Sequence, residues 1–164
     1  MTEGVLQEDI VVVFIQLPTP KLEKNQMGQV NVSVTLTNNI DQILAERGFI
    51  PEADVRQIVI DNVLVDTGAT LLCLPTKLIE QLGLPMHSET MVKTAAGEKQ
   101  ARIFKGADLS VAGRSSTFDC LELTEIEQPL LGVIPMERLG LEPDLRNERL
   151  KVLPDQSGMT YFYA

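Results

Sequence analysis

The chain has 164 residues, of which 44% are apolar, and a formal net charge of −9 at pH 7. This length and apolar content suffice for one domain with a buried core, and nothing in the sequence indicates a second folding unit. The acidic balance argues against binding to nucleic acid or to anionic membrane surfaces, because both would repel the protein.

The first element in the chain is an apolar, strand-like run at residues 10–17. It follows acidic rather than basic residues, so it is a poor signal peptide, and it is far too short to span a bilayer. Three interpretations of this run stay open: an added interface strand, a removable prosegment, or an edge strand that covers the main sheet.

A strand and a short helix are predicted next. Apolar and polar residues alternate over 30–37, which is the period of a half-buried strand. Residues 40–47 then form a predicted helix, with Asn39 as its N-cap and Gly48 as its stop. Gln42 stands at the capping-box position of this helix. The helix is therefore expected to be an insertion before the next strand.

The most informative stretch of the chain centres on Asp66. Alternation resumes over 55–61 and leads into an apolar run, after which the sequence reads Asp-Thr-Gly-Ala-Thr before a second apolar run. A carboxylate between two buried strands needs partners, and Thr67 and Thr70 supply hydroxyl groups for buried polar atoms. Gly68 lets another backbone approach closely. Taken alone, however, Asp-Thr-Gly is also ordinary turn chemistry.

A second helix and a hairpin follow. Residues 76–82 are predicted to be helical and to end at Gly83. Two runs within 88–103 flank a turn, in which Gly97 supplies the positive backbone angle. The turn residues are Ala95, Ala96, Gly97 and Glu98. The hairpin is either a flap that closes over a substrate or simply one of the hairpins that any antiparallel sheet needs.

The last predicted elements lie between residues 112 and 140. A hairpin turns at 112–114, and a strand follows at 117–123. The stretch 119–127 is locally rich in acidic residues, which a loop or a strand face explains. Further on, residues 133–139 form a predicted short helix that ends at Gly140. Leu130, Leu131 and Gly132 stand directly before this helix.

With Asp66-Thr67-Gly68-Ala69 followed later by Leu130-Leu131-Gly132, the chain resembles the retropepsin-like aspartic proteases, in particular their bacterial members. In that family the later pair of apolar residues and the glycine brace the catalytic loop. The likeness spans residues 28–154 and implies an all-β (mainly) fold, a closed β-barrel with two or three short helices. Residues 1–27 would then be an N-terminal extension, and residues 155–164 a C-terminal tail.

The resemblance implies an aspartic endopeptidase that acts as a homodimer. The sequence holds a single Asp-Thr-Gly, whereas the chemistry needs two carboxylates, so Asp66 from each subunit would meet at a two-fold axis. By the same resemblance, Thr67 would hydrogen-bond across the axis and Ala69 would line the subsite floor. The backbone near Ala96 and Gly97 would hold an extended polypeptide substrate. No cofactor is implied.

The tail concentrates aromatic residues at 161–163. A terminal strand of this kind has three interpretations, which are pairing across the two-fold axis, occupation of the cleft as a pseudo-substrate, and completion of the core of its own subunit.

Two other functions are weighed against proteolysis. The first is a catalytically silent or latent module that uses the same fold for dimerisation or peptide binding, because a fold does not fix a function. The second treats Asp66 as a phosphoryl acceptor, but the sequence lacks a phosphate-binding loop and a second acid two residues away.

Metal and disulfide chemistry are not expected. The single histidine, His87, has no cysteine or second histidine near it, so neither a metal site nor a histidine-based triad is predicted. Cys73 and Cys120 lie in apolar stretches, where a free thiol behaves as a small hydrophobic group. A reducing compartment, and therefore a cytoplasmic protein, is expected.

Overall fold

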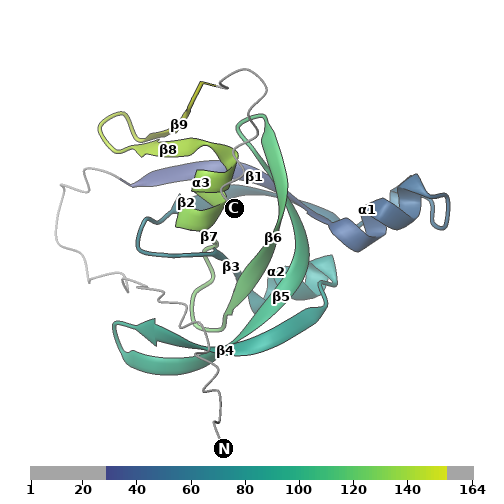
Figure 1. The fold of residues 1–164 in the computed structure, drawn as a ribbon, viewed down its shortest axis with the longest axis horizontal. Coiled ribbons are helices and arrows are strands. Elements are labelled where there is room, and N and C mark those ends of the chain that lie inside the picture. The colour runs from purple at the N-terminus through teal and green to yellow at the C-terminus, as the bar shows by residue number, and fades with distance from the viewer. Residues whose placement is uncertain (1–28, 155–164) are drawn as a thin grey trace, which may run out of the picture.

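The computed structural model describes residues 29–154 (Figure 1). The strands in this part are β1 (Val30–Asn38), β2 (Gln57–Val65), β3 (Leu72–Pro75), β4 (Met86–Thr94), β5 (Gly97–Val111), β6 (Arg114–Leu123), β7 (Leu130–Leu131), β8 (Leu141–Asp144) and β9 (Arg149–Val152). The helices are α1 (Asn39–Glu46), α2 (Thr76–Leu82) and α3 (Val133–Leu139), with a 3-10 turn, η1 (Glu52–Asp54). The apolar run at 10–17 and the aromatic tail lie outside the described residues.

The main sheet closes on itself. Its strand order is β1-β2-β7-β3-β6-β5-β4, and β1 also pairs with β5, so six strands form a ring and β4 is added outside it. Leu36 of β1, for example, stands opposite Leu109 of β5. Both side chains are fully buried in the core inside this ring. The predicted mainly β fold with a closed barrel and short helices is confirmed.

The first strand shows why the alternating pattern was informative. Val30, Val34 and Leu36 are buried, while Asn31 and Ser33 between them are exposed. Successive side chains of a strand point to opposite faces, so this alternation places the apolar set inside the barrel.

The N-cap of α1 was predicted one residue too late. The cap is Asn38, whose side-chain oxygen accepts a hydrogen bond from the Asp41 N–H at 3.1 Å. Asn38 is selected because its amide also donates to the carbonyl oxygen of Leu82 at 2.7 Å, so one buried side chain joins two helix ends. Asn39 instead starts the helix and donates to the Asp108 carboxylate. Gln42 makes no capping box, because it donates to Glu46 one turn later.

The insertion between β1 and β2 starts and ends at neighbouring positions of the sheet. Thr37 and Gln57 are paired across the two strands, and α1 projects away from the barrel in Figure 1. The base of the insertion is held by Arg56, whose guanidinium donates to both carboxylate oxygens of Asp41, at 2.7 and 2.9 Å. These hydrogen bonds lower the pKa of Asp41. The insertion therefore lengthens the chain without interrupting the barrel.

The two later helices end where glycine was predicted to end them. Gly83 follows α2 and Gly140 follows α3, and both adopt the left-handed conformation. The β8–β9 hairpin beyond α3 was not predicted from the sequence. Arg114 anchors it, because its guanidinium donates to the carbonyl oxygens of Leu139, Gly140 and Leu153.

Candidate active site

Asp66 lies in a turn at the end of β2. Its backbone N–H donates to the Leu131 carbonyl oxygen at 3.0 Å, and its own carbonyl accepts from the Ala69 N–H at 3.1 Å. One carboxylate oxygen accepts from the Gly68 N–H at 2.8 Å. Asp66 is half-buried, and Thr67 beside it is exposed. The turn thus orients one carboxylate oxygen while the residue keeps access to solvent.

The two-residue strand β7 lies between the strand that enters this turn and the strand that leaves it. Leu131 stands opposite Val65 in a parallel pairing with β2 and opposite Leu72 in an antiparallel pairing with β3. In addition, the Leu64 N–H donates to the Pro129 carbonyl oxygen at 3.0 Å. Leu130 and Leu131 are both buried. Both ends of the Asp66 turn are therefore fixed by hydrogen bonds to a single short segment.

Gly132 brings the start of α3 against the same turn. A Cβ atom on Gly132 would lie 2.3 Å from the Leu71 carbonyl oxygen and 2.7 Å from that of Ala69. The N–H groups of Val133 and Ile134, in the first turn of α3, donate to the carbonyl oxygens of Ala69 and Thr70, at 2.9 and 3.0 Å. The first N–H groups of a helix have no partner within the helix. These bonds therefore give partners both to the N–H groups of α3 and to the carbonyl oxygens of the turn. This close approach requires glycine at position 132.

Ala69 connects the Asp66 turn to the interior. It is 1% exposed and packs in a second apolar cluster, apart from the main core. Its buried neighbours in this cluster are Cys73, Val92, Leu121, Leu123 and Leu130. Because Val92 belongs to β4 and Leu121 and Leu123 to β6, this cluster joins the Asp66 turn to the β4–β5 hairpin.

The predicted hairpin is present, and it turns at Ala95 and Ala96 between paired Thr94 and Gly97. Gly97 has φ of 118°, as its position in the turn predicted. The Thr94 hydroxyl accepts from the Ala96 N–H at 3.2 Å and donates to the Gly97 carbonyl at 2.9 Å. Ala95 to Glu98 are all exposed. The turn is thus ordered by its own threonine, and its tip faces solvent.

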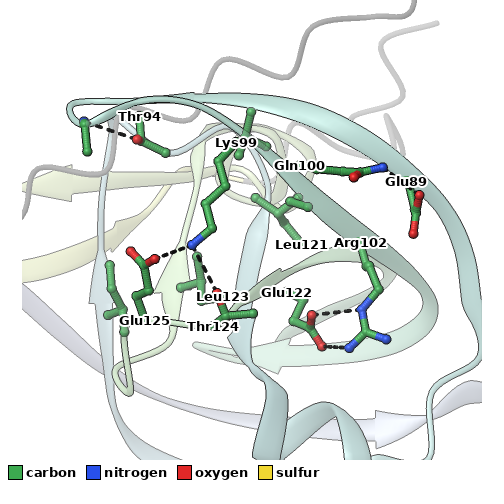
Figure 2. Close-up of a pocket in the computed structure, with 14 residues that line it drawn as sticks. Glu89, Thr94, Lys99, Gln100, Arg102, Leu121, Glu122, Leu123, Thr124 and Glu125 are labelled. Carbon is green, nitrogen blue, oxygen red and sulfur yellow. Dashed lines mark hydrogen bonds and ion pairs between the residues drawn. The ribbon is translucent and has the colours of Figure 1, made fainter.

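A cavity of about 240 Å³ lies between this hairpin and the segment that follows β6 (Figure 2). Its apolar wall consists of Val92, Ala101, Leu121, Leu123 and Ile126. These side chains belong, with Ala69, to the second apolar cluster. Asp66 is not among the lining residues, so within one chain the cavity is connected to the Asp66 turn through Ala69 and the cluster around it.

The charged residues around this cavity were not predicted from the sequence. The acid-rich stretch at 119–127 supplies Glu122 and Glu125, which are the partners of Arg102 and Lys99 on the hairpin. Glu122 has a side chain only 4% exposed, and its two oxygens accept from Arg102 at 3.0 and 2.6 Å. The Glu122 carboxylate raises the pKa of Arg102. The acidic run was visible in the sequence, but which basic residues pair with it depends on the register of β5 with β6.

The cysteines and the histidine have no catalytic arrangement in the described part of the chain. Cys73 and Cys120 are free and buried, and burial raises the pKa of each thiol to about 12, so neither is a thiolate at neutral pH. His87 is exposed. Within residues 29–154, no group of three or more His, Cys, Asp or Glu residues is placed to hold a metal ion. In the same range, no helix is long and apolar enough to cross a membrane.

The fold and the braced Asp-Thr-Gly turn define the class of protein as an aspartic protease. A family model described as aspartyl protease matches residues 52–134, a range that includes both the Asp66 turn and Gly132. The chain belongs to this family of protein-cleaving hydrolases, and the resemblance inferred from the sequence is confirmed at that level.

Among solved structures, the chain is similar to EIAV protease complexed with the inhibitor HBY-793, at 17% identity and a TM-score of 0.46, over 73% of this chain and 95% of that one. Among curated proteins, none matches.

Proposed function

We propose that this protein is an aspartic endopeptidase whose active site forms only in a homodimer. The observation that supports the proposal best is the Asp66 turn, which is held rigidly by β7 and α3 yet leaves Asp66 half-buried and Thr67 exposed. The described chain offers one such carboxylate. A symmetric dimer supplies the second, through an interface in which the same turn contacts itself.

In the proposed mechanism, two Asp66 carboxyl groups share the site. Repulsion between like charges keeps one of them protonated while the other is ionised. The ionised carboxylate accepts a proton from the attacking water, and the protonated carboxyl polarises the scissile carbonyl and then protonates the leaving amine. The two groups titrate as a pair, so their macroscopic pKa values belong to neither residue alone.

The neighbours of Asp66 have distinct proposed roles. Thr67 is exposed beside it, and so is available to bond across the two-fold axis. The Gly68 N–H orients one carboxylate oxygen. Leu130, Leu131 and Gly132 support the turn, since β7 carries its hydrogen bonds and Gly132 permits the approach of α3.

The proposed substrate is a polypeptide bound in an extended conformation. In the described sheet, β5 pairs only with β4 from Gly97 to Arg102, so backbone groups near the hairpin tip at Ala96 and Gly97 are available to a peptide. The apolar cavity beside Ala69 is suited to an uncharged side chain of that peptide. We also propose that the protein belongs to the bacterial branch of the family and is cytoplasmic, and the two buried, free thiols support the second point.

Cleavage of an unstructured protein tests the proposal. Wild-type protein and Asp66→Asn are incubated with casein between pH 3 and 8, with an aspartic-protease inhibitor as a third sample. We expect cleavage by wild type alone, with an unchanged circular dichroism spectrum and an unchanged dimer in the variant, because Asn preserves the shape but cannot ionise. Full activity in Asp66→Asn would refute the mechanism. No cleavage by a confirmed wild-type dimer would instead favour the silent peptide-binding module.

A further inference from the structure

In the described chain, the polar attachment of the tip of the β4–β5 hairpin to the rest of the domain is one ion pair, which adds to the packing of Val92 in the second apolar cluster. The Lys99 ammonium of β5 contacts the Glu125 carboxylate, and it also lies 3.3 Å from the Thr124 hydroxyl oxygen. Thr124 and Glu125 follow the end of β6. Figure 2 shows the lysine reaching from the hairpin across to these two residues. This contact bridges two segments that are far apart in the sequence.

No backbone pairing supports that bridge. The register between β5 and β6 starts at Val111 opposite Arg114 and ends at Ile103 opposite Leu121. Beyond that point β5 pairs only with β4, up to Gly97, while the end of β6 pairs with β3, up to Leu123. The two strands therefore diverge like the arms of a fork, and the cavity lies between the arms.

The other polar contacts around the cavity lie within the hairpin or at the base of the fork, not across its opening. Gln100 donates to Glu89 at 2.7 Å and joins the two strands of the hairpin to each other. Arg102 and Glu122 lie at the base of the fork, one residue beyond the last β5–β6 pair. Lys99 and Glu125 thus carry the polar contact that crosses the opening itself.

We propose that the Lys99–Glu125 pair is a gate that controls entry of an uncharged substrate side chain into the apolar cavity. Both side chains are substantially exposed, at 43% and 71%, so the pair is a weak and salt-sensitive contact. A contact of this kind is easily opened, which suits a gate better than a permanent link. The identity of the entering group as a substrate side chain rests on the proposed function, whereas the opening of the hairpin does not.

On the Glu125 side of the gate, the chain is fixed and continues toward the segment that holds the Asp66 turn. The segment that carries Glu125 continues to Gln128, which donates to the Asn31 side chain, and to Pro129, which accepts from the Leu64 N–H. The segment is thereby attached to β1 and β2 at its far end. We infer that the hairpin is the arm that moves when the pair opens.

Hydrogen–deuterium exchange of the full chain tests the gate without requiring catalysis. Exchange of amides 95–101 is compared among wild type, Lys99→Met, Glu125→Gln and the double variant Lys99→Glu/Glu125→Lys. Loss of a surface pair should speed hairpin opening about two- to five-fold in each single variant. The charge swap should restore slow exchange, and 1 M NaCl should move wild type toward the single variants. Lys93→Met is the matched control, an exposed lysine of the same hairpin outside the cavity lining.

The outcomes separate the gate from the proposed function. Unchanged exchange in both single variants, or a charge swap that fails to restore slow exchange, would overturn the gate. If exchange behaves as expected, two peptides that carry Leu or Ala at one position are then cleaved by wild type and by Lys99→Met. The KM for the Leu peptide should be lower in Lys99→Met than in wild type, with kcat unchanged. An expected exchange result combined with full casein cleavage by Asp66→Asn would leave the gate standing and refute the aspartic-protease mechanism.

Discussion

Substitution of Gly132 by alanine gives the sharpest test of how the Asp66 turn is held. Gly132 has φ of −88° and ψ of −175°, an extended conformation that any residue can adopt. Its replacement therefore introduces no backbone strain of its own. The added Cβ atom would lie 2.3 Å from the Leu71 carbonyl oxygen and 2.8 Å from its nitrogen. These are backbone atoms of the segment that leads from the Asp66 turn into β3, so this segment and α3 must separate.

The cost can be worked out from the contacts that separation disturbs. Inserting a methyl group into a packed site costs about 1–3 kcal/mol. Separation also weakens the bonds from Val133 to Ala69 and from Ile134 to Thr70, which contribute about 0.5–1.5 kcal/mol each. The expected loss is thus about 2–6 kcal/mol, a large part of the roughly 5–15 kcal/mol that stabilises a typical domain.

Gly48→Ala is the matched control for this experiment. Gly48 has φ of +78°, and no atom lies within 4 Å of a Cβ placed there, so its cost is conformational only, about 1–2 kcal/mol. It follows α1 in the insertion, away from the Asp66 turn. Urea unfolding measures the free energy of unfolding of both variants, and casein cleavage measures activity.

We expect Gly132→Ala to lose more stability than Gly48→Ala and to lose cleavage even where it remains folded, because the Asp66 turn is displaced. A free energy of unfolding of Gly132→Ala within about 0.5 kcal/mol of the wild-type value, a difference typical of neutral surface substitutions, would contradict this close packing. An equal loss of activity in both variants would contradict the expected displacement of the Asp66 turn.

Three further predictions concern other parts of the molecule. Thr67→Ala should weaken the dimer, so that specific activity falls most steeply on dilution, and an unchanged dissociation constant by analytical ultracentrifugation would contradict this role. The hydrogen bonds from Arg56 hold the pKa of Asp41 below its usual range in the folded protein. The unfolded chain therefore binds the proton more readily, and this carboxylate stabilises the fold at neutral pH but not at low pH. Asp41→Asn should therefore cost about 1.5–3 kcal/mol at pH 7, and the difference from wild type should shrink as the pH falls below about 4; a difference independent of pH would count against it. Cys73 and Cys120, with pKa values raised to about 12 by burial, should not react with Ellman's reagent at pH 8 until guanidinium unfolds the chain, and rapid labelling of the native protein would show the burial to be wrong.

The parts of the fold that were predicted correctly are those that depend on local sequence. Alternation in β1 follows from the pleat, and the ends of α2 and α3 follow from Gly83 and Gly140, which take a conformation that other residues disfavour. The Asp66 turn and Gly132 were recognised together because two motifs in a fixed order are far more specific than either motif alone.

The features that were missed depend on partners distant in the chain. Asn38 and Asn39 are equally good caps from sequence alone, and the choice is made by the Leu82 carbonyl, 44 residues away. The ion pairs of Lys99 and Arg102 need the register of β5 and β6, which alternation does not specify at the point where the strands diverge. The β8–β9 hairpin has short strands with Pro143 in the first of them, so it carries little periodic signal.

The geometry of the Asp66 turn is specified by two short windows of sequence and mostly through backbone atoms. Backbone hydrogen bonds of Leu64, Asp66, Ala69 and Thr70 join the turn to residues 129–134, and β2 also pairs with β1 as far as Val65. Side chains in these windows mainly have to be apolar, absent at Gly132, or acidic at Asp66. The rest of the barrel holds the windows in register, and many sequences can do so. This explains why the Asp66 turn was recognised from a few residues and the hairpin from its turn, whereas the cavity and its charged rim, which we propose receive the substrate, are evident only in the structure.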